Sequence, residues 1–489
     1  MQREFLLNIL FLVSINLLIK PFFIFGIDLE VQNRLPEGDY GLYFTLLNFT
    51  YLFQILNDFG IQNFNNRHVS QHPHLLSKYF PNLLAIKFLL STLYVCVALL
   101  AAWTLAGYGW QELPLLLILL CNQVLAQGIL FLRSSISGLG HYRVDSLLSS
   151  LDKMLMLFTC GVLLWAVPGG YLSAESFALA QTLALGATAV VVAFVLRSKA
   201  PLRVRPTWLR DWRKGRAALV FLFRKSFPYA LVILLMTAYT RLDAVLLERL
   251  LPDGRKHADV YAGAYRLLDA ANMFGYLFAT LLLPMFARML RHGGDVRPLV
   301  SVGFRLIWAG SVTLAAVVFF SRNDLVHLMM PERASAYRAD TLGLLFWAFV
   351  PVSATYIFST LLTAAERLGS MNRVFVLGIA LDVALNLLLI PRFEALGSAA
   401  AALCTQAFVA GGMVYICLKN YALRPSASEL AGTLGFAATV LLADKLIFEI
   451  PALSWAAKVW LALAVSLAAA LLFRQVDARQ LRNWSNTFK

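Results

Sequence analysis

Charged residues are scarce in this sequence. Asp, Glu, Lys and Arg make up 14% of its 489 residues, whereas about 25% is usual in soluble domains. Hydrophobic residues reach 60%, and no stretch is both polar enough and long enough to fold as a water-facing domain. The composition therefore excludes a string of soluble domains and predicts a membrane-embedded bundle.

Acidic residues are few, and paired cysteines and nucleotide-binding motifs are missing. The 27 acidic residues stand against 42 basic ones, a net charge of +15. In a membrane protein this excess marks loops at the anionic inner leaflet, so nucleic acid is not expected as a partner. The five cysteines lie in apolar runs without a CxxC pair, which indicates buried hydrophobes. Because there is no Walker motif, direct coupling to ATP is not expected. No cofactor is expected either, and the histidine-rich loop with His68, His72 and His74 has no carboxylate or thiol nearby, so a metal site is not expected.

Apolar runs long enough to cross a bilayer, which takes about 20 residues, occur about fourteen times. They fall near 5–27, 41–60, 81–106, 112–133, 146–168, 172–196, 226–249, 260–288, 299–320, 340–364, 372–391, 395–418, 428–449 and 453–473. The first run has no small-residue cleavage site after it, so it is expected to be a retained helix. These runs predict an all-α integral membrane protein with about 14 transmembrane helices.

The distribution of Lys and Arg predicts the topology. The densest basic stretch lies at 197–225 between the sixth and seventh runs, and by the positive-inside rule this side and both termini are cytoplasmic. The stretch is either a plain linker or a short helix in the membrane interface. It divides the chain into an N-terminal lobe at 1–196, a basic linker at 197–225, a C-terminal lobe at 226–418, and two last helices with a tail at 419–489.

An internal repeat supports two related halves. GIDLEVQNRLPEGDYGLY runs from Gly26 to Tyr43, and RLDAVLLERLLPDGRKHADVYAGAY runs from Arg241 to Tyr265. In each copy an Asp stands six residues before an Arg, which is followed by Leu, Pro, an acidic residue and Gly. Repeated halves around a central site are the usual construction of secondary transporters.

Several segments of the chain resemble polysaccharide exporters. GDYGLYFTLLNF at 38–49, NDFGIQNFNNR at 57–67, DVYAGAYRLLDAANMFGYLFATLLLPMFAR at 259–288 and ALNLLLIPRFEALGSAAAALCTQ at 384–406 are similar to the successive signatures of Wzx-type O-antigen flippases. These belong to the MOP (multidrug/oligosaccharidyl-lipid/polysaccharide) superfamily. The resemblance implies two pseudo-symmetric six-helix lobes that form a V around a central cavity, followed by two C-terminal helices.

The same resemblance implies a function. Members of this family are not enzymes; they move undecaprenyl-pyrophosphate-linked oligosaccharide repeat units from the cytoplasmic to the periplasmic leaflet of the bacterial inner membrane by alternating access. The implied partners are this lipid-linked substrate, the bilayer, and polysaccharide polymerase and chain-length machinery. A lipid II flippase and a drug exporter of the same superfamily remain alternatives. A polyprenyl-dependent glycosyltransferase is a further one, because Asp28 and Glu30 are acidic residues in the first external loop.

Intramembrane cations are the candidates for binding the pyrophosphate, because an anion in hydrocarbon needs a fixed positive partner. The predicted binding residues are Arg266, Arg241, Lys20, Lys153 and Arg133. Arg266 ranks first. Arg241 and Asp243 point in opposite directions on one helix, so one of them is expected to meet a neighbouring helix.

Acidic and amide side chains are the candidates for orienting these cations or for coupling to an ion gradient. Asp269 follows Arg266 at i+3, close enough to pair with it. Asp382 and Asn386 share a helix face at i and i+4, and Asp58 ends the second run. Together with Asp243 they form the predicted orienting or ion-coupling set, and the sequence leaves open whether Na⁺ or H⁺ is coupled.

Overall fold

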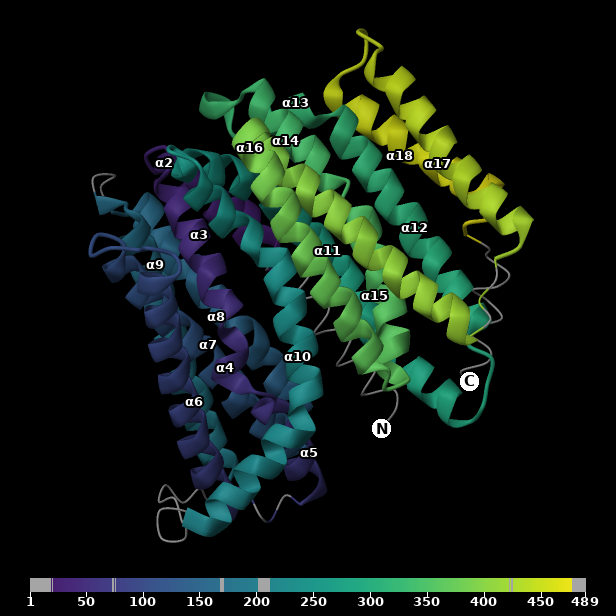
Figure 1. Cartoon of the computed structure of the whole chain (residues 1–489). Coiled ribbons are helices and arrows are strands. Elements are labelled where there is room, and N and C mark those ends of the chain that lie inside the picture. The colour runs from purple at the N-terminus through teal and green to yellow at the C-terminus, as the bar shows by residue number, and fades with distance from the viewer. Residues whose placement is uncertain are drawn as a thin grey trace. The chain divides into compact units, whose positions relative to one another are not determined.

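The computed structural model describes residues 19, 21–72, 74, 76–167, 171–200, 212–421, 423 and 425–476. Regular structure within these ranges is helical. The elements are η1 (Phe23–Asp28), α2 (Leu29–Arg34), α3 (Asp39–Leu52), α4 (Gln54–Asp58), α5 (Ile61–Gln71), α6 (Leu76–Thr104), α7 (Leu113–Gly138), α8 (Tyr142–Trp165), α9 (Ala174–Lys199), α10 (Trp212–Leu250), α11 (Gly254–Arg291), α12 (Arg297–Phe320), α13 (Arg322–Met329), η4 (Pro331–Arg333), α14 (Ala336–Phe346), α15 (Phe349–Ala364), α16 (Leu368–Tyr421), α17 (Ala427–Phe448) and α18 (Trp455–Leu472) (Figure 1). The predicted all-α membrane class is confirmed.

Eleven helical segments of the described chain are long and apolar enough to cross a membrane. One of them, α16, contains two predicted spans, 372–391 and 395–418, which meet at a kink where Glu394 has φ 53° just after Pro391. The predicted run 41–60 is not one continuous helix. It forms α3 and α4 with a break at Phe53, and Phe59 at φ 46° ends α4 in the left-handed region. Most of the run 5–27, including Lys20, lies outside the described residues.

The chain forms two compact units, Met1–Asp259 and Val260–Lys489. In the first unit, α7 packs against α9 and α5, and α3 packs against α10. The Phe80 and Phe131 rings stack at 5.7 Å within its apolar core. Gly138 at the end of α7 has no side chain and so leaves room for Val69 of α5, since a Cβ at position 138 would lie 2.8 Å from the Val69 side chain.

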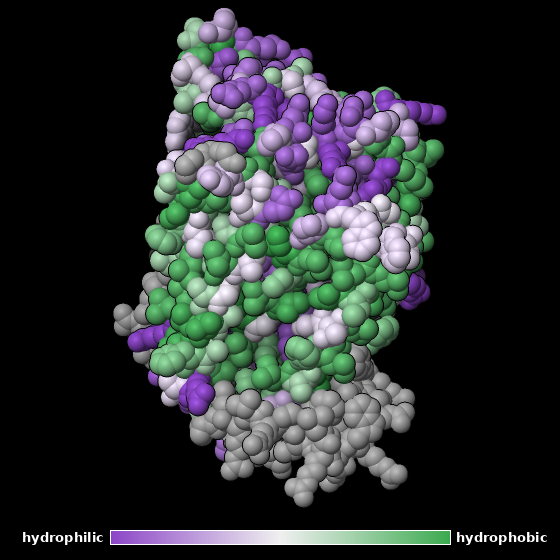
Figure 2. Space-filling model, turned by 90° about the vertical axis from the view of Figure 1, so that its left-hand side faces the viewer, coloured by the Kyte–Doolittle hydropathy of each residue, from purple (hydrophilic) through white to green (hydrophobic). Residues whose placement is uncertain are grey.

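The outer surface of the first unit is apolar. Phe88, Trp103 and Phe194 are 76%, 77% and 74% exposed, which water would penalise and lipid would not. Figure 2 shows a broad apolar band on one face, with polar residues gathered at its upper end. This pattern is that of a helical bundle surrounded by lipid.

In the second unit, α12 packs against α14, α15 and α17, and α17 pairs with α18 (Figure 1). The first turn of α17 is fixed by a capping box, in which the Ser426 side chain accepts from the Glu429 N–H and the Glu429 carboxylate accepts from the Ser426 N–H. Glu429 also forms an ion pair with Arg305 of α12. These contacts join the start of the C-terminal hairpin α17–α18 to α12.

Candidate functional site

Arg241 lies on α10, within an apolar span, and is partly buried against α3. Its guanidinium donates to the Asn48 side-chain oxygen at 3.2 Å and lies 5.2 Å from the centre of the Tyr51 ring. Asp243, two residues on, is 2% exposed. The prediction that one of these two residues meets a neighbouring helix agrees with these contacts. Both the planar amide acceptor and the ring favour arginine over lysine at position 241.

Lys153 lies on α8 beside the π-helix η1. Its Nζ is 5.3 Å from the centre of the Phe23 ring and 3.5 Å from the Met156 sulfur. The π-helix begins two residues after Pro21, a residue that disturbs regular α-helical hydrogen bonding. It ends at Asp28, whose carboxylate accepts from the Tyr40 hydroxyl at 2.9 Å. Asp28 is therefore engaged in a contact within the first unit.

The two repeat copies place their arginines in matching environments. Arg34 pairs with Glu30 at 2.8 Å and lies 5.9 Å from the centre of the Trp165 ring. Arg249 pairs with Glu248 at 2.8 Å and lies 3.8 Å from the Tyr108 ring centre. Each arginine thus has an acidic neighbour on its own helix and an aromatic ring from a distant part of the chain, Trp165 at the end of α8 and Tyr108 in the segment between α6 and α7. This likeness in three dimensions supports the repeat read from the sequence.

A loop network surrounds Arg249. Glu112 forms an ion pair with Arg255, and Arg255 Nε is 3.7 Å from the Glu248 carboxylate. Burial raises the pKa of the Tyr108 hydroxyl, and the nearby Glu248 carboxylate raises it further. At Glu112, partial burial opposes ionisation, but the Gly109 N–H and the Arg255 guanidinium outweigh it and lower the pKa. The network joins the segment between α6 and α7 to the turn between α10 and α11.

The remaining predicted residues of the first unit are held in ion pairs. Arg133 Nε donates to the Asp145 carboxylate at 2.8 Å, which fixes it between α7 and the first turn of α8. Asp58 lies 3.3 Å from Lys87 Nζ, and Lys87 also donates to the Asn57 carbonyl at 2.7 Å. Lys87 is only 4% exposed, so its ammonium group is enclosed by the fold.

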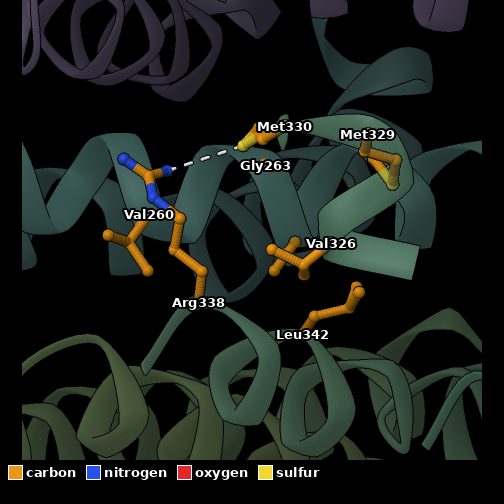
Figure 3. A pocket seen from close by; sticks show the side chains of 8 residues that line it. Val260, Gly263, Val326, Met329, Met330, Arg338 and Leu342 are labelled. Carbon is orange, nitrogen blue, oxygen red and sulfur yellow. Dashed lines mark hydrogen bonds between the residues drawn. The ribbon is translucent and has the colours of Figure 1, made fainter. Parts of the chain in front are cut away.

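In the second unit, Arg266 lies on α11 and is 5% exposed. Asp269 is half-buried one turn further along the same helix. Near the start of α11 a pocket is lined by Val260, Gly263, Ala264, Val326, Met329, Met330, Arg338 and Leu342 (Figure 3). Arg338 of α14 is also 5% exposed, and its guanidinium donates to the Met330 sulfur at 3.7 Å. The described part of this unit therefore holds at least two buried guanidinium groups.

Asp382 is the centre of a buried polar cluster in α16. Its side chain accepts from the Thr405 hydroxyl at 3.3 Å, and the Asn386 amide donates to the Asp382 backbone carbonyl at 3.0 Å. All three residues are 0% exposed. Thr405 belongs to the part of α16 beyond the kink at Glu394, so the kink brings a hydroxyl back onto the predicted pair. Oxygen donors of this kind suit a hard cation or a proton.

Among the described residues, five buried charged side chains lie outside the predicted site set: Lys87, Glu248, Asp259, Arg338, and Asp444 of α17, which is 0% exposed. Arg338 precedes the apolar run 340–364 and reads as a loop residue, although Ser335 caps the helix three residues earlier. A serine immediately before a helical run is a sequence signal for a helix N-terminus, and it would have placed Arg338 in the first turn of the helix. The pairing of Lys87 with Asp58 has no local signal, because 29 residues separate them.

The chain matches a protein family profile in sequence and several solved structures in fold. The sequence profile of a family described as "Polysaccharide biosynthesis protein" matches residues 5–290. A solved structure of the lipid II flippase MurJ in an inward closed conformation is similar with a TM-score of 0.68 at 10% identity, covering 94% of this chain and 98% of that chain. An inward-facing multidrug resistance MATE transporter of the MOP superfamily gives 0.60 at 12% identity, with 83% and 96% covered.

A Vibrio cholerae MATE transporter, VcmN, gives a TM-score of 0.57 at 15% identity and covers 86% of this chain and 98% of that chain. No curated protein matches. At such low identities these similarities establish the fold, and the shared fold is that of MurJ and of the MATE transporters.

Proposed function

Because the chain belongs to the polysaccharide biosynthesis protein family, we propose that it is a flippase for a lipid-linked oligosaccharide. The cargo would be an undecaprenyl-pyrophosphate-linked repeat unit of the O-antigen type, moved from the cytoplasmic to the periplasmic leaflet of a bacterial inner membrane. The observation that carries the proposal is the presence of buried guanidinium groups, Arg266 above all, inside apolar helices of a chain with the fold of a lipid flippase.

Pyrophosphate determines which side chains are needed. A charged head group that leaves water without a partner loses its hydration, at a cost of several kcal/mol or more. A cation at mid-helix itself costs about 2.5–3.5 kcal/mol of insertion free energy. Arg241, Lys153 and Arg266 would therefore destabilise the inserted protein unless a partner or a bound anion offsets this cost. Arginine suits phosphate because its planar fork can donate two parallel hydrogen bonds. In this proposal the head group exchanges water for these donors while the polyprenyl tail stays in lipid.

Alternating access needs a step that resets the protein, and we place ion coupling at Asp382. Its carboxylate, the Thr405 hydroxyl and the Asn386 side chain are fully buried together. A Na⁺ ion or a proton bound there would neutralise the carboxylate. The ion would dissociate from the carboxylate when the gradient favours its release. The Asp382→Asn variant should then bind cargo normally but lose the dependence of transport on the ion gradient.

The central test uses a deletion strain. Completed, unpolymerised lipid-linked repeat units should accumulate on the cytoplasmic leaflet, and the wild-type gene should relieve this. The Arg266→Ala gene should not relieve the accumulation. Losing a buried charge contact costs about 2 kcal/mol or more, which lowers the transport rate by at least about thirtyfold. Arg288→Ala is the matched control, since Arg288 lies on the same helix but is exposed. Amounts of each variant in the membrane fraction must be equal.

The outcomes separate the alternatives. Normal export by an inserted Arg266→Ala variant would refute the role of the buried cations. Structurally incomplete intermediates would point to a glycosyltransferase, and a block in cell-wall synthesis to a lipid II flippase. Changed antibiotic susceptibility with unchanged surface polysaccharide would indicate a drug exporter of the same fold.

A further inference from the structure

The C-terminal hairpin contains a buried carboxyl group unlike the other acids of the described chain. Asp444 of α17 is 0% exposed, and neither of its carboxyl oxygens has a hydrogen-bond partner among the described residues. By contrast, buried Glu248 pairs with Arg249, Asp58 pairs with Lys87, and Asp382 accepts from a threonine. Asp444 is therefore an ionisable group that the packing surrounds but does not neutralise.

The surroundings of Asp444 are apolar. Phe436, Val440 and Ile447 are buried on the same helix, at the spacing of one face. Ile447 also belongs to a cluster with Val317 of α12 and Ala462 of α18, the two helices that pack on α17. The other buried side-chain polar atoms of α17 and α18 without a hydrogen-bond partner are the hydroxyl of Ser466, a residue that is 2% exposed, and the indole nitrogen of Trp455 at the start of α18.

The charged groups on these three helices are engaged elsewhere or point outward. Arg297 of α12 pairs with Asp295, Arg305 of α12 pairs with Glu429 of α17, and Lys458 of α18 donates to the Phe448 carbonyl at 3.0 Å. Lys445, next to Asp444, is exposed. None of them forms an ion pair or a hydrogen bond with Asp444, so no cation among the described residues compensates the carboxylate.

The energetic consequence is specific. A carboxylate enclosed without a partner costs several kcal/mol after relaxation, and such a group takes up a proton instead. We propose that Asp444 is an intramembrane proton-binding site, and that its protonation stabilises the packing of the α17–α18 hairpin against α12. Loss of the proton to water leaves a carboxylate that is stable only if water reaches it, which requires this part of the hairpin to separate from α12.

The hairpin geometry gives this site a defined place. Polar contacts hold the beginnings of α12 and α17 together, through the Arg305 ion pair and through Trp308, whose indole N–H donates to the Thr433 carbonyl at 3.3 Å. Further along the two helices, Val317 and Ile447 share an apolar cluster, and Asp444 lies three residues before Ile447 on the same buried face of α17. Ionisation of Asp444 would thus loosen one end of the interface while the other remains attached. The proposal goes beyond the transport function and holds for any cargo.

Dicyclohexylcarbodiimide provides the first test, because it modifies protonated carboxyl groups in apolar surroundings. The full-length protein in proteoliposomes is treated from mildly acidic to alkaline pH, and adducts are located by peptide mass mapping. We expect an adduct on Asp444 at neutral pH that declines as the pH rises, and none in the Asp444→Asn variant. Treatment of the unfolded protein in acidic detergent shows that the peptide can be modified and detected.

Three results would overturn the proposal: no adduct on Asp444 in the folded protein at any pH, an adduct that does not depend on pH, or protection by NaCl at neutral pH. The last would make the residue a metal-cation ligand.

A second measurement tests the link to packing. Cysteines replace Val317 and Ile447, which share one cluster in a region without native cysteines, and disulfide formation is measured against pH. The measured quantity is the ratio of cross-linking in the protein with Asp444 to cross-linking of the same cysteine pair in the Asp444→Asn background. This ratio should fall with rising pH, by at most about tenfold per pH unit for one proton. The Asp444→Asn background cancels the pH dependence of thiol chemistry. A constant ratio would refute the coupling between protonation and packing.

Discussion

Gly41 allows α3 to approach the start of α11 closely. A Cβ on Gly41 would collide with the Arg255 carbonyl oxygen and would lie 2.8 Å from the Asp259 backbone nitrogen. Backbone atoms cannot rotate away as a flexible side chain can, so Gly41→Ala must push the two segments apart. Overpacking of this kind costs about 1–3 kcal/mol. The same movement would stretch the two hydrogen bonds from the Gln32 amide to Asp259, at 2.8 and 2.9 Å, each worth about 1 kcal/mol.

Gly128→Ala is the matched control for this prediction. Gly128 lies inside α7, and a Cβ there meets nothing within 4 Å. Its replacement should be neutral or stabilising, by up to about 1 kcal/mol from helix propensity. The thermal unfolding midpoint of each purified variant is measured by size-exclusion chromatography after heating. The midpoint should fall for Gly41→Ala and should stay level or rise for Gly128→Ala. Equal midpoints for the two variants would refute the close approach of α3 and α11.

Other contacts of the first unit make further predictions. Asp58→Asn leaves the buried Lys87 ammonium without its carboxylate partner and should destabilise the protein by about 3–5 kcal/mol, whereas the double replacement Asp58→Asn with Lys87→Met should recover most of this in a thermal unfolding assay. The folded state lowers the pKa of Glu112, so the stability that its contact with Arg255 contributes is present at neutral pH and is lost as the pH falls through the folded value. Because Arg255 is 44% exposed, the loss should be at most about 1 kcal/mol, and the unfolding midpoint of Glu112→Gln should change less on acidification than that of the wild type. Arg241→Lys should reduce export with normal insertion, since the ammonium group cannot replace the stacked, planar guanidinium.

Hydrophobic periodicity and length were sufficient to predict most helices of this chain. The run 299–320 corresponds to α12 at 297–320, and 428–449 corresponds to α17 at 427–448, because a segment that must satisfy its backbone within lipid has few alternatives to a helix. The exceptions come from backbone geometry. Neither the break at Phe53 nor the kink at Glu394 changes the hydrophobicity of its run, so a hydropathy pattern does not detect either of them.

The candidate site was less accessible from sequence, for a physical reason. The types of residue were predictable, since a charged side chain inside an apolar run is costly wherever it lies. Their partners were not. Arg241 meets Asn48, which is 193 residues away, and the Thr405 hydroxyl reaches Asp382 only because α16 is kinked. The isolation of Asp444 is a stronger case, because the absence of a partner is a property of the whole packing and has no signature in a single segment.

The division of the chain shows the same limit. The basic stretch 197–225 predicts where the lobes are joined, and this boundary follows polarity along the chain. Packing divides the protein later, between Asp259 and Val260, since α10 lies against α3 and the first turn of α11 contacts Gly41. One helix, α11, therefore begins in the first compact unit and carries Arg266 in the second. A change that displaces its first turn should alter the position of Arg266 without touching it, and export by the Gly41→Ala variant, assayed below its unfolding midpoint and compared with Gly128→Ala, measures that effect. Export equal to that of the control would mean that the start of α11 does not position Arg266.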